Sequence, residues 1–536
     1  MPDSERTDLL DLVGADAERA WRLAHGLDLQ LEACQYRGDT AERTLETVVP
    51  WIMEQIGAQG IAIELLGRGE VWKVLHFGGD REELETFVSE QRKQATNDGR
   101  LCCLPIDIHD ETIGYIAASF ASPPPSPGAS ILLEIAWEEL DNVLYELRRA
   151  RFRHDQVIEV ERRLQNHVLE QAIDHTAGYV MAETGASSLA VVYLEDTGDR
   201  PRRRCRVFSG QELLVAASTG DESKLGQLLG SEGSLDPTEL IGAAGIEVQA
   251  ISTAVIETGL SSMAEHGFVV ATGSERAVTG AELELVQHFA VALGQRLVDY
   301  HKDQRYLQQF FSPDTVTRLL SVQNYQQEFL TPRLRDVAIL YSDINSFTKI
   351  SEQILDGPAE VGALIDFWSA GVVDILFKHG GAFDKMVGDC VIGLFGTPFD
   401  DLTPEQRVAG ALRAAFEICE YTATLSGIPE VDKICASDLI PGLGVATGVH
   451  FGNTMVGTFG PNNAFTAFGR EMNNAARLQG VAGFREILIM EAARDVLVRV
   501  DHPLEKELEW GEVKQASVKN VKDPLSFHSF VFDGGD

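Results

Sequence analysis

The sequence predicts a multidomain α/β protein whose domains are joined by long helices, and three observations lead to this prediction. The chain has 536 residues, enough for three or four domains of roughly 150 residues each. Short apolar runs typical of strands are interspersed with segments whose apolar residues recur at helical spacing. The hydrophobic content of 44% and the charged content of 24% are those of globular proteins with sizeable cores.

The composition also restricts the partners and the compartment. The formal net charge of −37 disfavours binding to nucleic acid or to anionic lipid. The seven cysteines are scattered and lack the paired spacing of metal sites, which favours a reducing cytoplasm over a disulfide framework. The acidic N-terminus does not resemble a signal peptide. No apolar run reaches the ~18 residues that a membrane span needs.

The N-terminal half reads as a helical segment followed by two similar units. Residues 1–37 carry apolar side chains at helical spacing. Residues 38–150 combine a helix, strand-like runs and a hairpin closed by a helix, and residues 151–300 follow a similar order, which indicates a tandem repeat. This order of elements resembles two GAF sensory domains. The resemblance implies a small-molecule ligand, which the sequence does not name.

Two groups of residues in this half could carry chemistry, and a structural role is favoured for both. Cys102 and Cys103 could attach or ligate a group, but two small side chains on a core strand fit better. The arginine-rich stretch 201–206 could contact an anion, but we favour a solvated loop.

Residues 301–330 are expected to form a helical linker. A helix from about 280 to 300 runs into Phe311-Ser312-Pro313-Asp314, and a further short helix is expected over 315–320. We expect the linker to pass a movement from the sensory units to the C-terminal domain. A passive connection is the alternative.

The C-terminal segment 331–536 contains two carboxylates placed to hold metal. An apolar run over 337–341 predicts a buried strand, and it leads directly to Asp343, where helix-start residues offer free backbone N–H groups to a phosphate. Further along, two short strands meet at Gly388-Asp389, which places Asp389 at the tip of a turn. Carboxylates at the ends of adjacent strands can hold Mg2+, which takes oxygen ligands and shares them with substrate phosphates.

The strand that ends in Asp343-Ile344-Asn345-Ser346-Phe347-Thr348, followed by Lys385-Met386-Val387-Gly388-Asp389, resembles the catalytic domain of class III nucleotidyl cyclases, the adenylate and guanylate cyclase family. The resemblance implies an α+β, ferredoxin-like domain over 331–536. It further implies that ATP is converted to 3′,5′-cyclic AMP and pyrophosphate by attack of the ribose 3′-oxygen on the α-phosphorus. Asp343, Asp389 and the backbone carbonyl of Ile344 are then expected to hold two Mg2+ ions, with Mn2+ as the alternative metal.

The same resemblance assigns the substrate contacts. Lys385 and Thr466 are expected to read the purine. Asn473 is expected to orient the ribose and Arg477 to stabilise the transition-state phosphate, and a helix that begins near Arg470 would place both on one face. The remaining expected substrate-binding residues are Phe347, Thr348 and Lys519.

Individual positions refine the expected activity. A lysine at 385, where guanylate cyclases usually carry an acidic residue, favours ATP. Thr466 in place of aspartate resembles a subclass that includes bicarbonate-responsive soluble cyclases, so we hypothesise stimulation by bicarbonate. Ser346 stands where glycine is frequent in the family.

The family also implies the oligomeric state. Its active sites are shared between two subunits, with the metal aspartates from one and Lys385, Thr466, Asn473 and Arg477 from the other, so a homodimer is expected. Two alternatives stay open. One is a guanylate cyclase, and the other is a catalytically silent scaffold that binds a ligand through its N-terminal half.

Overall fold

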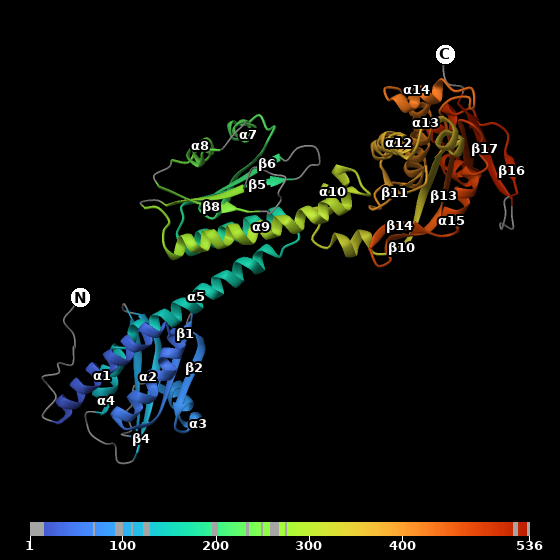
Figure 1. Cartoon of the computed structure of the whole chain (residues 1–536). Helices are drawn as coiled ribbons and strands as arrows, with labels where there is room; N and C mark the ends of the chain where they lie inside the picture. The colour runs from blue at the N-terminus through green and yellow to red at the C-terminus, as the bar shows by residue number, and fades with distance from the viewer. Residues whose placement is uncertain are drawn as a thin grey trace. The chain divides into compact units, whose positions relative to one another are not determined.

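The computed structural model (Figure 1) describes residues 15–67, 70–91, 100–108, 111–121, 129–195, 202–231, 235–247, 250–257, 267–273, 276–517 and 524–532. The chain divides into two compact units, Met1–Val160 and Glu161–Asp536. Helix α5, Asp141–Leu164, continues from the first unit into the second. None of the helices in the described ranges has both the length and the apolar character that a membrane crossing requires.

The first unit is a four-stranded antiparallel sheet in the order β2-β1-β4-β3, with helices on both faces. Alternate residues of β1 divide between the two faces. Ile61 and Ile63 enter the core formed with α1, α2 and α4, whereas Ala62 meets α3. Cys102 is buried and Cys103 half-buried on β3, which confirms that both lie on a strand, with Cys102 in the core. The elements are α1 Ala15–Arg37, α2 Ala41–Ile56, β1 Ala58–Gly67, β2 Glu70–Gly78, α3 Arg81–Gln91, β3 Leu101–Ile108, β4 Glu111–Phe120 and α4 Ala129–Glu138.

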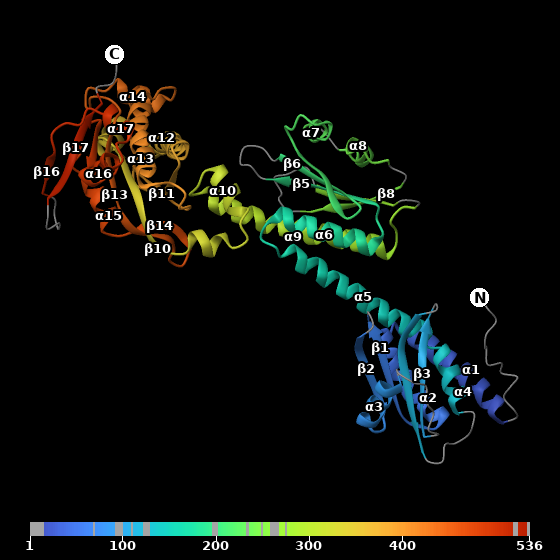
Figure 2. The same cartoon turned by 180° about the vertical axis from the view of Figure 1, so that it is seen from behind.

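The second unit begins with a five-stranded antiparallel sheet in the order β7-β6-β5-β9-β8. Helices α6 and α9 lie side by side along one face, and the short helices α7 and α8 cover the other (Figure 2). The elements are α6 Leu169–Thr184, β5 Ser188–Glu195, β6 Arg202–Ser209, β7 Glu212–Ser218, α7 Lys224–Leu229, α8 Pro237–Ala243, β8 Ala250–Ile256, β9 Gly267–Gly273 and α9 Ala281–Gln308.

The arginine-rich stretch is a strand, so the solvated-loop interpretation is wrong. Residues from Arg202 onward form β6, and Cys205 is buried in the core of this sheet. Arg206 donates from Nε and Nη2 to the two oxygens of Asp174 at 2.7 and 2.6 Å. Arg204 donates to Glu195 at 2.8 Å. Acidic partners from α6 and β5 thus neutralise arginines that would otherwise disfavour a strand in this core.

The C-terminal domain is ferredoxin-like, as predicted. Its chain order β10-α12-β11-β12-α13-β13 forms a sheet with neighbours β11-β12-β10-β13, which is the split βαβ arrangement. Strands β15, β17 and β16 extend the sheet, and β14 pairs with the end of β13. The elements are α10 Pro313–Leu320, η2 Gln326–Leu330, β10 Arg333–Ile344, α11 Phe347–Lys349, η3 Ile350–Ile354, α12 Pro358–Lys378, β11 Gly381–Val387, β12 Cys390–Phe395, α13 Pro404–Thr424, α14 Pro429–Cys435, β13 Val445–Phe459, β14 Ala464–Phe468, α15 Arg470–Gln479, β15 Glu486–Met490, α16 Glu491–Arg499, α17 Pro503–Glu507, β16 Lys514–Ala516 and β17 Leu525–Val531.

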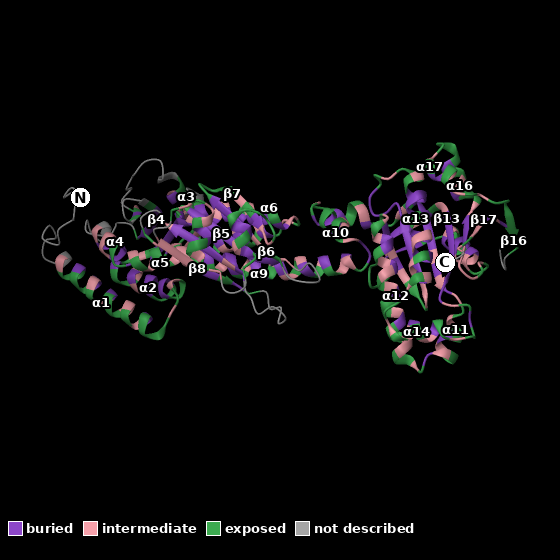
Figure 3. Cartoon of the chain, turned by 90° about the horizontal axis from the view of Figure 1, so that it is seen from above, coloured by how far each residue is buried: buried purple, intermediate pink, exposed green. Residues whose placement is uncertain are grey.

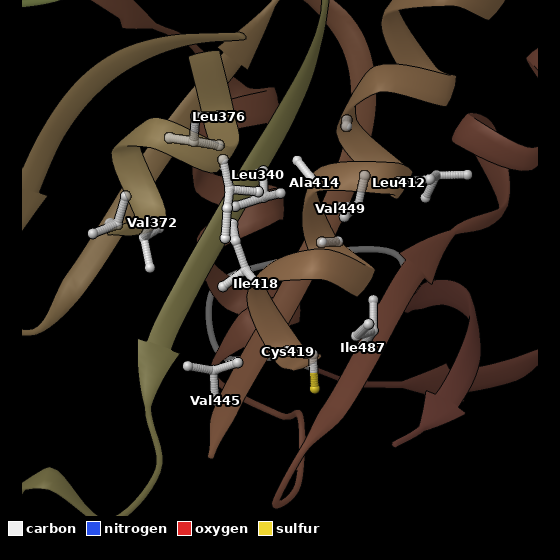
Figure 4. Close-up of a cluster of buried hydrophobic side chains, with 14 of the residues drawn as sticks. Leu340, Val372, Leu376, Leu412, Ala414, Ile418, Cys419, Val445, Val449 and Ile487 are labelled. Carbon is white, nitrogen blue, oxygen red and sulfur yellow. The ribbon is translucent and has the colours of Figure 1, made fainter. Parts of the chain in front are cut away.

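Strand β10 separates two cores. Ala338 and Leu340 pack with α12 and α13 on one face. Figure 4 shows Leu340 among side chains of α12, α13 and β13, and Figure 3 shows buried residues along β13 and α13. Val337 and Ile339 pack on the other face with α15 and with the segment after α9. Because side chains alternate along a strand, Asp343 projects from the same face as Val337 and Ile339, toward α15.

The predicted linker packs into the C-terminal domain itself. Phe310, Phe311 and helix α10 join the core on the α15 face of the sheet. The ring of Phe311 lies 4.8 Å from that of Phe465 on β14. The N–H of Phe383 on β11 donates to the carbonyl of Phe310 at 2.8 Å. The linker therefore contacts β11 and β14 directly.

Candidate active site

Strand pairing brings the two predicted metal aspartates together. In the β10–β12 register Asp343 lies opposite Cys390, the first residue of β12, so Asp389 in the preceding turn is its neighbour. Gly388 has a φ of +66°, a left-handed conformation that glycine adopts without strain. Burial, and then the hydrogen bond and charge of Asp389, raise the pKa of Asp343 to about 7. Gln479, at the end of α15, donates to Asp343 Oδ2 at 3.5 Å and partly opposes this rise.

This carboxylate pair fits a hard divalent cation. Asp389 Oδ2 is buried and has no hydrogen-bond partner among the residues that the structure describes. Burial and Asp389 disfavour the ionised form of Asp343, and a cation bound between the two carboxylates would stabilise that form. Within the described ranges no group of three or more His, Cys, Asp or Glu residues surrounds a metal position. Further ligands would therefore come from backbone, substrate and water, as is usual for Mg2+. The contribution of the Ile344 carbonyl stays a prediction.

The turn after β10 holds the next predicted site residues. Ser346 has a φ of +56°, a conformation that favours glycine and accounts for the glycine frequent at this position in the resembling family. Phe347 begins the short helix α11 and packs partly against the core beneath α12. Thr348 is exposed. Their predicted contacts with substrate stay predictions.

Lys385 and Thr466 meet, although 81 positions separate them in the sequence. Lys385 Nζ donates to Thr466 Oγ1 at 2.9 Å. Thr466 is held on β14 opposite Gly457 of β13. The Lys385 ammonium also lies 5.8 Å from the ring centroid of Phe468. An ammonium donor beside a hydroxyl forms a polar pair suited to the edge of a purine.

Helix α15 presents the two remaining residues. It begins at Arg470, as predicted, and carries Asn473 and Arg477 one turn apart. Asn473 is exposed and Arg477 half-buried. Neither side chain makes a hydrogen bond or ion pair to any other described residue. The amide and guanidinium are therefore available to a ribose and a phosphate.

The underside of α15 is fixed by a buried polar cluster that the sequence did not suggest. Glu471 accepts hydrogen bonds from His450 at 2.6 Å, from Asn474 at 3.1 Å and from Arg470 at 3.1 Å. Burial raises the pKa of Glu471, but the bonds to His450 and Arg470 outweigh it and leave the pKa below its usual value. A Cβ at Gly448 would lie 2.7 Å from the backbone nitrogen of Gln479. The helix can therefore approach β13 only because that residue is glycine.

The predicted site residues thus form three groups in one chain. They are the Asp343–Asp389 pair, the Lys385–Thr466 pair, and the Asn473–Arg477 face of α15. No hydrogen bond or ion pair joins the first pair to the second among the described residues. Lys519 lies outside the described residues. Residues that sequence reasoning missed are Gln479, Glu471, His450 and Asp384. Gln479, Glu471 and Asp384 each lie within two positions of a predicted site residue, a signal that could have pointed to them, whereas His450 had none.

Residues 330–530 match the adenylate and guanylate cyclase catalytic domain family. This segment is a cyclase catalytic domain. An uncharacterized protein of Mycobacterium tuberculosis is 30% identical over 164 residues, 30% of this chain and 27% of that protein. An adenylate cyclase of Anabaena cylindrica is 24% identical over 189 residues, 34% of this chain and 35% of the relative.

Among solved structures, the adenylyl cyclase CyaB from P. aeruginosa is 24% identical, with a TM-score of 0.32. The match covers 38% of this chain and 97% of that one. The chain spans about a third or less of the length of the two curated relatives. The family of the cyclase domain includes both adenylate and guanylate cyclases.

Proposed function

We propose that this protein is an adenylate cyclase that converts ATP to 3′,5′-cyclic AMP and pyrophosphate. The observation that supports this proposal most strongly is the hydrogen bond between Lys385 and Thr466 within a cyclase domain. Lysine can donate to a purine ring nitrogen, and threonine can accept from an exocyclic amine, which is the pattern of adenine.

The carboxylates would hold two Mg2+ ions, or Mn2+, together with the Ile344 carbonyl. Bound there, the metal would lower the pKa of the ribose 3′-hydroxyl and neutralise phosphate charge. The pairing of β10 with β12 and the β11–β12 turn keep Asp343 and Asp389 close to each other before substrate arrives. This pre-organisation is most stabilising in a site that partly excludes water, where charges interact strongly.

The chain's other residues position the reacting groups. Asn473 would hold the ribose so that its 3′-oxygen faces the α-phosphorus, and Arg477 would neutralise charge on the α-phosphoryl oxygens as it develops. The new bond joins the 3′-oxygen to phosphorus, the bond to the pyrophosphate oxygen breaks, and the hydroxyl proton leaves to solvent. No protein nucleophile is needed, because positioning and charge neutralisation account for most of such a phosphoryl transfer.

We further propose a homodimer with shared sites. Met386, Val387 and Phe468 flank the Lys385–Thr466 pair, and 37%, 61% and 53% of their surfaces are exposed. Exposed apolar side chains gathered beside polar site residues are typical of a protein interface. The unpartnered Asn473 and Arg477 would then face the carboxylates of a second subunit.

The N-terminal half is proposed to regulate this activity. Both of its sheets are antiparallel and covered by helices, an arrangement compatible with the GAF-like interpretation and with binding of a small molecule. Bicarbonate remains a proposed stimulator, and a flat dose response in the purified enzyme would contradict it. All seven cysteines are free, which supports the proposed cytoplasmic location.

The proposal is tested by measuring cyclic nucleotide formation from ATP and from GTP with Mg2+ or Mn2+. We expect cyclic AMP as the main product and none from Asp343→Ala. Cyclic GMP as the main product would favour the guanylate cyclase alternative. The absence of any product with the full chain and with its N-terminal half deleted would favour the silent scaffold.

A further inference from the structure

A carboxylate without a role in the proposed mechanism lies buried beside the Lys385–Thr466 pair. None of the Asp384 side chain is exposed, and its Oδ2 lies 3.6 Å from Lys385 Nζ. Neither oxygen makes a hydrogen bond of normal geometry to another described residue. Burying an ionised carboxylate with so few partners is energetically unfavourable. Buried polar groups with unsatisfied hydrogen bonds are rare in native proteins and often have a functional role.

A β-bulge directs this carboxylate inward. The β11–β12 register shifts between Phe383 and Lys385, which leaves Asp384 as the extra residue. A bulge re-aims side chains and is common beside active sites. Here Asp384 turns into the domain while the neighbouring Lys385 stays 43% exposed. The bond from the Phe383 N–H to the linker carbonyl of Phe310 ties the residue before the bulge in place.

The neighbours of the carboxylate are the two purine-reading residues. Burial raises the pKa of Asp384 above its usual value, and the Thr466 hydroxyl, the Lys385 ammonium and the Ala467 N–H each oppose this rise. These groups therefore stabilise the ionised form. Strand β14, which carries Thr466 and Ala467, contacts β11, the strand that contains the bulge.

The number of hydrogen bonds that the Thr466 hydroxyl can make then determines where its hydrogen points. A hydroxyl has one hydrogen to donate and two lone pairs that accept. One lone pair already accepts from Lys385 Nζ at 2.9 Å. An ionised carboxylate only accepts, so the Thr466 hydrogen is drawn to Asp384. The second lone pair is left for a ligand.

We propose that Asp384 is a positioning residue that fixes the Thr466 hydroxyl as an acceptor and so selects a 6-amino purine over a 6-oxo purine. An exocyclic amine donates to the free lone pair, whereas a 6-carbonyl oxygen would face another acceptor. Without Asp384 the hydroxyl can rotate and donate to that carbonyl. This inference rests on the proposed function, because it assumes that a purine nucleotide occupies the Lys385–Thr466 site.

The test is the ratio of kcat/KM for ATP to kcat/KM for GTP in Asp384→Asn. The amide keeps the shape of the side chain but removes its charge and can donate to Thr466 after a flip. We expect the ratio to fall about ten-fold, the effect of one net hydrogen bond. Both activities come from one preparation, so a loss of folded protein cancels from the ratio. The matched control is Asp336→Asn, which removes the β10 carboxylate that accepts from Asn453 at 2.8 Å and should leave the ratio unchanged.

A double-mutant cycle shows whether Asp384 acts through Thr466. In a Thr466→Ala background, Asp384→Asn should cause no further change in the ratio. The inference is overturned if the single variant keeps the wild-type ratio, or if its full effect persists without the hydroxyl. A wild-type chain silent toward both triphosphates would contradict the proposed function alone. The ratio of ATP to GTP affinities, measured by calorimetry on the same variants, would then decide this inference.

Discussion

Replacing Asp343 by asparagine should stabilise the metal-free protein while abolishing its activity. In the metal-free chain, burial and Asp389 raise the pKa of Asp343 from 3.8 to about 7. The native state thus holds a proton that the unfolded state has lost between those values. Stability therefore falls as pH rises through this window, and the loss is complete above about pH 7. Asparagine carries no charge and removes the effect.

The size of the expected stabilisation follows from the pKa shift of Asp343. About three pKa units would correspond to about 4 kcal/mol for a fully buried group. Asp343 is half-buried, and solvent screening reduces the expected gain to roughly 1–2 kcal/mol at pH 8, with almost none at pH 4. The assay is urea unfolding in the presence of a chelator across this pH range. Added Mg2+ should then stabilise the wild type but not the variant.

Either of two results would refute this reasoning. A variant that is destabilised equally at pH 4 and pH 8 would show that burial and Asp389 do not disfavour the ionised form of Asp343. Equal stabilisation of wild type and variant by Mg2+ would show that Asp343 does not hold the metal. Asp336→Asn, with its exposed carboxylate, is the control for the loss of one charge elsewhere on β10.

Three further predictions follow from single side chains. Lys385→Glu should lower the ratio of ATP to GTP turnover, because an acceptor replaces the donor to the ring nitrogen; an unchanged ratio in a variant with the wild-type urea midpoint would contradict the assignment. Ser346→Gly should raise the free energy of unfolding by up to about 1 kcal/mol with activity retained, since it relieves a left-handed φ; urea unfolding that shows a loss would refute the strain. Phe311→Ala should lower the unfolding free energy of the cyclase domain by about 3–5 kcal/mol, because Phe311 is 2% exposed. The control Val291→Ala, on the exposed side of α9, should have almost no effect. A loss below about 1 kcal/mol for Phe311→Ala would mean that the linker is not part of this core.

Much of the catalytic half could be predicted because its signals are local. The apolar run before Asp343 and the Gly388-Asp389 turn both correspond to observed elements, and helix α15 begins at Arg470 as expected. The pairing of Lys385 with Thr466 could be expected only from the family resemblance. No spacing rule links positions 81 residues apart, and their contact depends on β11 and β14 converging on the linker.

The sequence did not predict the surroundings of charged residues that are buried by contacts with distant parts of the chain. Arg204 and Arg206 resemble solvent-exposed residues in the sequence, yet Asp174 and Glu195 neutralise them within a sheet. Asp384 likewise resembles an ordinary surface aspartate before Lys385. Its burial depends on a bulge, which hydrophobic periodicity does not reveal.

The most direct test of the account is complementation between two inactive subunits. Asp343→Asn and Arg477→Ala chains with different tags are co-expressed, and mixed dimers are isolated by both tags. If the metal carboxylates and Arg477 act across the dimer, each mixed dimer contains one intact site and should show about half of wild-type activity. Mixed dimers of Asp343→Asn with Asp389→Asn, which lose the same half of every site, should stay inactive. No recovery in the first pair, with mixed dimers demonstrated, would contradict the shared site.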